Sequence, residues 1–191
     1  MEILVVTTHS EGGKDYLDNL FKYLGDDRMI LGKPYGVCSK DPAAIADMFW
    51  LVAKFFGNAG KNLAIHYIIS FSRDTVQDEW TAFRIVNEVL QPLIDEHMAF
   101  LVVHRETRGD SDYHVHIAVS TTNFKDGTLL RPDNKLNFLM AQRIADITDE
   151  KCAFDPDYNY SEDEDQNKEE IQSQNNAKKR FFRKFSPQSE F

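Results

Sequence analysis

The stretch from His104 to Ser120, HRETRGDSDYHVHIAVS, decides the fold of this chain. Four apolar residues, Phe100 to Val103, lead into it. The segment from Arg105 to Asp112 then contains no aliphatic side chain, which is typical of a hairpin loop. After the loop, large apolar residues alternate with polar or small ones, and a period of two indicates a strand with one apolar face. The stretch therefore predicts two antiparallel strands joined by a polar loop.

Three histidines lie in this hairpin, namely His104, His114 and His116. His114 and His116 share one strand face, with Cα atoms about 6.5–7 Å apart. His104 ends the preceding strand and is expected to lie close to both across the hairpin. Because the whole chain has only six histidines, this grouping favours a metal site over a hairpin that merely exposes histidines to solvent. Three neutral imidazoles with open positions are typical of a catalytic divalent metal.

The composition is that of a folded domain with a sizeable core, because 42% of the 191 residues are hydrophobic. No apolar run approaches the roughly 20 residues of a membrane span, and no signal peptide opens the sequence. Cys38 and Cys152 are too few for a disulfide framework, so we expect a cytoplasmic protein without a membrane span. A net charge of −9 argues against broad, non-specific binding of nucleic acid.

Strands and helices are predicted to alternate on both sides of the hairpin. Helix periodicity and turn residues predict strands at 2–8 and 63–72 and helices at 14–24, 43–56, 74–96 and 133–147. Asp41 and Pro42 form a start signal for the second helix, and Asp74 with Gln77 resembles a capping box. Residues 27–40 are expected to be irregular. The simplest arrangement is an α+β fold, with an antiparallel sheet that has helices on one face and the site on the other.

The composition changes near the end of the chain. Residues 1–154 are predicted to form one domain, and residues 155–191 a charged tail that is disordered or loosely helical. This tail is acidic at first and ends in a basic run, for which contact with nucleic acid or a partner is one interpretation and a solvated end the other. The run consists of Lys178, Lys179, Arg180, Arg183 and Lys184.

Several motifs together resemble one family. They are KYLGDDR at 22–28, GVCS at 36–39 before an Ala-rich helix, HYIISF at 66–71, and the H-x9-H-x-H hairpin, which is followed by a turn ending in Asp126-Gly127. The first 130 residues thereby resemble the MOBP-type relaxases, the mobilisation nucleases of plasmids and conjugative elements. These belong to the His-hydrophobic-His class of single-strand endonucleases. The resemblance implies a five-stranded antiparallel sheet with flanking helices, related to the ferredoxin-like fold.

The resemblance also implies a reaction. A tyrosine phenolate would attack one phosphodiester of single-stranded DNA at an origin of transfer, leaving a 5′-phosphotyrosyl link and a free 3′-hydroxyl. The three histidines would hold Mg²⁺ or Mn²⁺, and Zn²⁺ is a further candidate because imidazole binds it more tightly. Tyr23 matches the family position of the nucleophile, Tyr16 is the reserve and Tyr35 the third choice. Accessory relaxosome proteins are implied partners.

Three further residues are candidates for supporting roles. His66 and Ser70 share one face of a predicted strand, where His66 is either a buried histidine satisfied by a neighbour or a group near the metal or the DNA. Glu106 stands where the family often has an acidic residue. Three other functions stay open: a replication-initiator nuclease of the same class, a metal-dependent hydrolase that uses water, and a non-catalytic single-strand binder. A tyrosine on an early helix favours the relaxase over the initiator.

Overall fold

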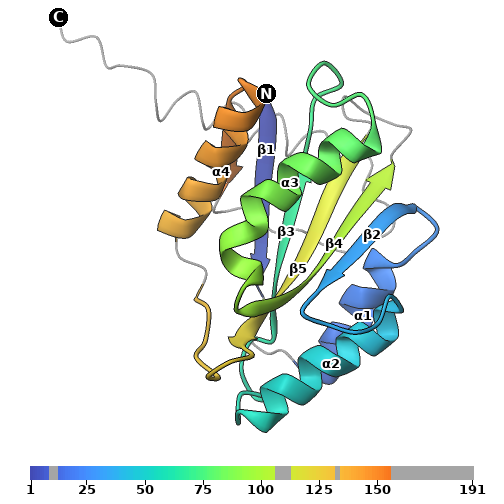
Figure 1. Cartoon of the computed structure of the whole chain (residues 1–191), viewed down its shortest axis with the longest axis vertical. Coiled ribbons are helices and arrows are strands. Elements are labelled where there is room, and N and C mark those ends of the chain that lie inside the picture. The colour runs from blue at the N-terminus through green and yellow to red at the C-terminus, as the bar shows by residue number, and fades with distance from the viewer. Residues whose placement is uncertain (9–12, 106–112, 132–133, 156–191) are drawn as a thin grey trace, which may run out of the picture.

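A computed structural model of the chain describes residues 1–8, 13–105, 113–131 and 134–155, and these form a mixed α+β fold (Figure 1). In chain order the elements of these ranges are β1 (Glu2–Thr8), α1 (Lys14–Leu24), β2 (Met29–Tyr35), α2 (Pro42–Phe55), β3 (Ala64–Ser70), α3 (Glu79–Ile94), β4 (His97–Arg105), β5 (Tyr113–Asn123), α4 (Asn134–Thr148) and β6 (Cys152–Asp155). The α+β class and the β4–β5 strand pair predicted from the sequence are confirmed. The predicted tail falls on residues outside the described ranges.

The sheet has six strands in the order β2-β4-β5-β3-β1-β6. The pairs β2–β4, β4–β5, β5–β3 and β3–β1 are antiparallel, whereas β1 and β6 run parallel. The prediction of five antiparallel strands is therefore wrong, because the described sheet is mixed and has one strand more. The histidine-bearing hairpin occupies the middle of this sheet, so β3, β4 and β5 each have a paired strand on both sides.

The two edge strands are the ones that the sequence pattern failed to show. Residues 27–40 were expected to be irregular, but β2 pairs with β4 along Leu31 to Tyr35. Gly32 and Pro34 weaken the strand signal, and a proline is tolerated there because β2 lies at the edge of the sheet. At the other edge, β6 is only four residues long, which is too short for its alternation to be recognised.

Helices cover both faces of the sheet, which corrects the expectation of helices on one face only. One core cluster joins α3 and α4 to the sheet through side chains such as Leu90, Ile117 and Ile144. A second joins α1 and α2 to the opposite face through Phe21, Phe49 and residues of β4 and β5 (Figure 1). The strand periodicity was correct, but both sets of alternating residues are buried.

The helix boundaries follow from identifiable caps. Asp41 caps α2, since its carboxylate accepts a hydrogen bond from the Ala43 amide at 3.4 Å, and Pro42 is the first helical residue, as predicted. The predicted capping box at Asp74 is wrong. α3 starts at Glu79, where Asp78 accepts hydrogen bonds from the Thr81 amide at 2.9 Å and the Thr81 hydroxyl at 2.7 Å. No helix of the described ranges is long and apolar enough to cross a membrane.

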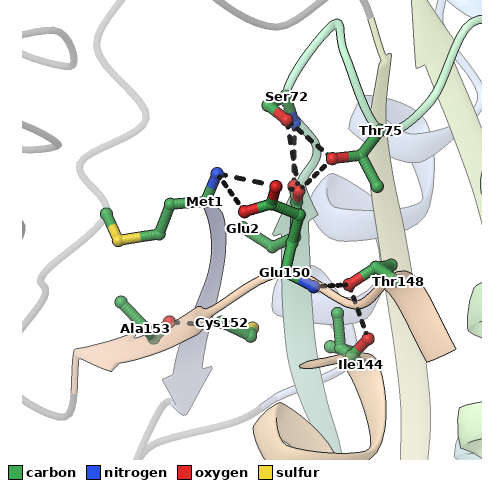
Figure 2. Close-up of polar contacts among 9 residues, drawn as sticks. All are labelled: Met1, Glu2, Ser72, Thr75, Ile144, Thr148, Glu150, Cys152 and Ala153. Atoms are coloured by element: carbon green, nitrogen blue, oxygen red, sulfur yellow. Dashed lines mark hydrogen bonds and ion pairs between the residues drawn. The ribbon is translucent and has the colours of Figure 1, made fainter. Parts of the chain in front are cut away.

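A buried carboxylate ties the start of β1 to the segment after β3. Glu2 is fully buried and accepts hydrogen bonds from the Ser72 amide at 2.8 Å, the Ser72 hydroxyl at 3.3 Å and the Thr75 hydroxyl at 2.7 Å (Figure 2). The N-terminal ammonium lies 3.9 Å from Glu2 and 3.5 Å from Glu150. These contacts satisfy a charge that would be costly to bury alone.

Candidate active site

Four histidines share the sheet face that α1 and α2 cover, and they are called the histidine cluster below: His66, His104, His114 and His116. On β4 and β5, His104 and His114 are directly opposite each other. His116 lies two residues along β5, on the same face. His66, from β3, is brought to this face because it pairs with Ala118, whose side chain belongs to the core under α1 and α2. The sheet register thus gathers histidines from three strands.

The rings of the cluster are close and buried. The ring centres of His104 and His116 are 4.5 Å apart, and those of His66 and His116 are 5.4 Å apart. A hydrogen bond of 3.2 Å joins His66 Nε2 to His116 Nδ1. All four side chains are at least 95% buried. The rings of His66, His104 and His116 are therefore neighbours on this face, whereas the convergence of His104, His114 and His116 on one ion stays a prediction.

Burial disfavours the protonated form of two rings of this cluster, His104 and His116. It lowers the pKa of His104 below the usual value, and it lowers the pKa of His116 well below that value, where the neighbouring histidines His104, His66 and His114 act in the same direction. A neutral imidazole has one nitrogen with a lone pair, and this form binds metals. The lowered pKa values of His104 and His116 therefore favour the form of these two rings that metal binding needs.

His104 has a defined tautomer and one nitrogen left over. Its Nε2 lies 3.0 Å from the carbonyl oxygen of Leu24, and because a carbonyl only accepts, Nε2 carries the proton and donates it. The lone pair is then on Nδ1, which is buried and has no hydrogen-bond partner within the described structure. Metal-binding histidines usually donate their other N–H to a carbonyl or carboxylate in this way. His104 therefore fits the role of a metal ligand.

The donor set fits a metal in residue type, but it is not assembled around one point. Among the described residues, no group of three or more His, Cys, Asp or Glu side chains is arranged to hold a metal ion. The hydrogen bond between His66 and His116 occupies one nitrogen of each ring. Metal binding through Nδ1 of His116 would thus replace this hydrogen bond.

Tyr23 packs directly against the histidine cluster. It lies in the last turn of α1, and its ring centre is 5.3 Å from that of His116, 5.8 Å from His104 and 6.2 Å from His66. Tyr16 is on the same helix, two turns or about 10.5 Å earlier along the axis, and packs on the core between α1 and α2. The end of α1 therefore places the Tyr23 ring against the histidine cluster.

Tyr35 is not a candidate nucleophile. It packs with the core under α3 and α4, on the sheet face opposite the histidine cluster, and donates a hydrogen bond to the Asn87 side chain. Burial raises its pKa to about 12, which disfavours the phenolate. The choice of Tyr35 as third candidate is therefore corrected by the position of β2, which the sequence pattern had not shown to be a strand.

The remaining predicted residues divide into two groups. Ser70 is half-buried and sits directly opposite His114 in the sheet, so it borders the cluster as expected from its shared face with His66. Glu106 and the basic run Lys178, Lys179, Arg180, Arg183 and Lys184 lie outside the described residues.

Two residues of the site were missed by sequence reasoning. Asp26 and Arg28 follow α1 and form an ion pair, with the Arg28 Nη2 atom 2.6 Å from Asp26 Oδ2. The guanidinium carbon of Arg28 is 4.9 Å from the Tyr23 ring centre, and Asp26 Oδ1 is 4.0 Å from His104 Nε2. Burial alone would raise the pKa of Asp26, but its hydrogen bonds with Arg28 outweigh burial and the pKa is lowered. The signal was present in the GDDR that follows Tyr23 and Leu24.

Comparison with solved structures gives distant similarities. A structure named Molecular Basis of Vancomycin Resistance Transfer in Staphylococcus aureus aligns with 81% of this chain and 100% of its own, at 9% identity and a TM-score of 0.47. The conjugative relaxase TrwC, in a metal-bound complex with oriT DNA, aligns with 97% of this chain and 86% of its own, at 13% identity and a TM-score of 0.44. No curated protein gives a significant match.

The sequence of the chain also matches a family model. The match spans residues 23–153, more than half of the chain, and the family is the MobA/VirD2-like nuclease domain of the relaxases. The matched segment starts at Tyr23, contains the whole histidine cluster and ends within β6. Because both TM-scores lie below 0.5, the assignment rests on this match and not on the solved structures. The chain therefore belongs to the relaxase family, as a MobA/VirD2-like nuclease domain.

Proposed function

We propose that this chain nicks single-stranded DNA at an origin of transfer, with Tyr23 as the nucleophile and a divalent metal held by histidines. The observation that carries this proposal is the contact of the Tyr23 ring with His66, His104 and His116. A tyrosine and a set of neutral imidazoles are thereby brought together inside a domain of the relaxase family. Mobilisation of a plasmid or related element is the process in which such a nick serves.

The metal would be held by His104, His114 and His116, with His66 as a neighbour that bonds to His116. Of these, His104 already offers a buried nitrogen without a hydrogen-bond partner. When bound, Mg²⁺, Mn²⁺ or Zn²⁺ would polarise the scissile phosphate and stabilise the charge that builds up on its oxygens. The direct hydrogen bond from His104 to the Leu24 carbonyl would keep that ring oriented while it binds.

The bond changes fall on Tyr23 and the phosphodiester. The phenol loses its proton, its oxygen bonds to the 5′-phosphorus, the bond from phosphorus to the 3′-oxygen breaks, and that oxygen gains a proton. A phenol of ordinary pKa near 10 is mostly protonated at neutral pH, so its surroundings have to favour the anion. The C-terminal end of α1 disfavours an anion, whereas the Arg28 guanidinium 4.9 Å from the ring favours one.

A covalent-adduct assay tests this proposal. Oligonucleotides labelled at the 3′ end and tiled over the DNA that flanks the coding sequence are incubated with the protein and Mn²⁺. A 5′-phosphotyrosyl link keeps the label on the protein, so a slow-moving labelled band appears on a denaturing gel. We expect Tyr23→Phe to abolish this band and to leave single-strand binding nearly unchanged, because the stacking surface remains.

Tyr16→Phe is the matched control, since it removes a hydroxyl from the same helix two turns earlier. It should retain the adduct. An adduct that survives in Tyr23→Phe and disappears in Tyr16→Phe would move the nucleophile to Tyr16. Cleavage that persists in both variants would identify water as the nucleophile and contradict the proposal. Binding without any cleavage would favour a non-catalytic single-strand binder.

A further inference from the structure

The turn after α1 contains an ion pair between Asp26 and Arg28 that is held by four hydrogen bonds. Asp26 Oδ1 accepts hydrogen bonds from the Arg28 amide at 2.8 Å and from its Nε at 3.2 Å, and Asp26 Oδ2 accepts from Nη2 at 2.6 Å and from Nε at 3.0 Å. This two-pronged geometry uses the fork of the guanidinium, which a lysine does not have. The side chain of Arg28 is therefore held in one orientation by its neighbour two residues earlier.

The backbone around this pair is equally constrained. The Gly25 amide donates to the Phe21 carbonyl at 3.0 Å, and the Met29 amide donates to the Asp26 carbonyl at 3.0 Å. From β4, the Arg105 amide donates to the Arg28 carbonyl at 3.2 Å. Gly25 is required here, because a Cβ at that position would collide with the ring of Pro42. The turn is thus anchored to α1, to α2 and to β4.

This anchored pair meets both parts of the site. The guanidinium carbon of Arg28 lies over the Tyr23 ring at 4.9 Å, a distance at which cation–π attraction acts. The imidazoles of the histidine cluster contact the same ring, and Asp26 Oδ1 is 4.0 Å from His104 Nε2. The Tyr23 ring is therefore bordered by Arg28 as well as by the imidazoles.

We propose that Arg28, held by Asp26, is a positioning residue that fixes the Tyr23 ring against the histidine cluster. The inference rests on the proposed function, since it explains how the nucleophile is kept in place for attack on a phosphate. Removal of the Arg28 guanidinium would abolish its cation–π contact with the half-buried Tyr23 ring and leave the contacts of that ring with the imidazoles. A displacement of about 1 Å in a reacting group lowers a rate on the order of 100-fold.

A measurement without DNA tests the positioning directly. Tyr23 is replaced by 3-fluorotyrosine, and the ¹⁹F spectrum of the metal-free protein is recorded at a single pH. With Arg28 in place, we expect the ¹⁹F chemical shift to differ clearly from that of the denatured chain. In Arg28→Gln this difference should become smaller, because the ring averages between orientations. In Arg28→Lys, which keeps the charge, the difference should be partly restored. Arg84→Gln, at an exposed position of α3, is the matched control and should leave the ¹⁹F spectrum unchanged.

Adduct formation provides the second readout. Arg28→Gln should lower the rate at saturating DNA on the order of 100-fold and leave the DNA concentration for half-maximal rate nearly unchanged. Combining it with Asp26→Asn should cause little further loss, because the two residues act as one unit. An unchanged ¹⁹F spectrum in folded Arg28→Gln, or an additive double variant, would overturn the inference. If the unchanged protein forms no adduct, the proposed function fails, while the ¹⁹F comparison still decides whether Arg28 holds the ring.

Discussion

His97 shows how burial sets the charge of a single residue in this fold. It is 7% exposed, and burial lowers its pKa despite a hydrogen bond between its Nδ1 and the Ser120 carbonyl, at 2.9 Å, and the nearby carboxylates of Glu96 and Asp126. The unfolded chain takes up a proton on this group at about pH 6.5. The folded chain takes up this proton only at lower pH. The contribution of the neutral His97 ring to the free energy of unfolding is therefore fully present above pH 6.5 and is lost as the pH falls below that value.

We therefore expect the stability deficit of His97→Gln, relative to the unchanged protein, to be smaller at pH 5.5 than at pH 7.5. The glutamine can still donate to the Ser120 carbonyl but takes up no proton. The stability deficit at pH 5.5 is expected to be smaller than that at pH 7.5 by about 1 kcal/mol or less. Urea unfolding of both proteins at the two pH values measures it. A deficit that is constant or that widens at pH 5.5 would contradict the assignment of a lowered pKa.

A second prediction for a single residue concerns His104 as a ligand of a metal ion. Added Mn²⁺ or Zn²⁺ should raise the thermal midpoint, because a metal that binds only the folded state stabilises it by about 2.7 kcal/mol at 100 times its dissociation constant. His104→Gln should lose most of this increase. His97→Gln is the matched control, since it removes another buried histidine of β4 and should keep the increase. No rise in the midpoint with either ion would count against a metal site.

At the scale of elements, Glu2 links β1 to the segment that connects β3 and α3 (Figure 2). Glu2→Ala should reduce the free energy of unfolding by about 3 kcal/mol, because it removes the three hydrogen bonds that the buried carboxylate accepts from Ser72 and Thr75. Glu150→Ala removes a half-exposed partner of the same N-terminus and should cost about 1 kcal/mol or less. Chemical denaturation of the two variants gives the comparison, and equal losses would show that the Glu2 bonds do not hold β1 in place.

The sequence predicted those elements whose signals are local. α1 and its end at Gly25, the Asp41 cap of α2 and the β4–β5 pair all depend on neighbouring residues or on short periods. It failed for β2, where pairing with β4 overrides the poor strand propensity of Gly32 and Pro34. The same division applies to the site. Spacing placed three histidines on one face, whereas the contact of Arg28 with Tyr23 depends on a turn geometry that spacing does not encode.

At the scale of the whole molecule, the net charge of −9 repels the DNA that the chain is proposed to bind. Such repulsion is screened beyond about 8 Å at physiological ionic strength, so attraction has to come from groups close to the phosphate. The ion pair of Arg28 with Asp26 offsets the charge of this arginine, so the pair is expected to add little to that attraction. A site that relies on few local charges favours selective binding of one DNA segment over general affinity for polyanions.

β6, the last strand of the described residues, pairs with β1 and buries Phe154 against α4 and the sheet. Removing residues 157–191 leaves β6 intact, and because residues 155–174 have few apolar side chains, the thermal midpoint should stay within a few degrees.

Removing residues 152–191 also deletes β6. The loss of buried Phe154 alone is worth about 3 kcal/mol or more, which lowers the midpoint of a chain of this size by roughly 6–12 °C. Calorimetry of the two truncations against the full chain measures both shifts. Equal midpoints for the two would mean that β6 adds nothing to the sheet, and a large drop in the longer one would mean that the tail belongs to the core.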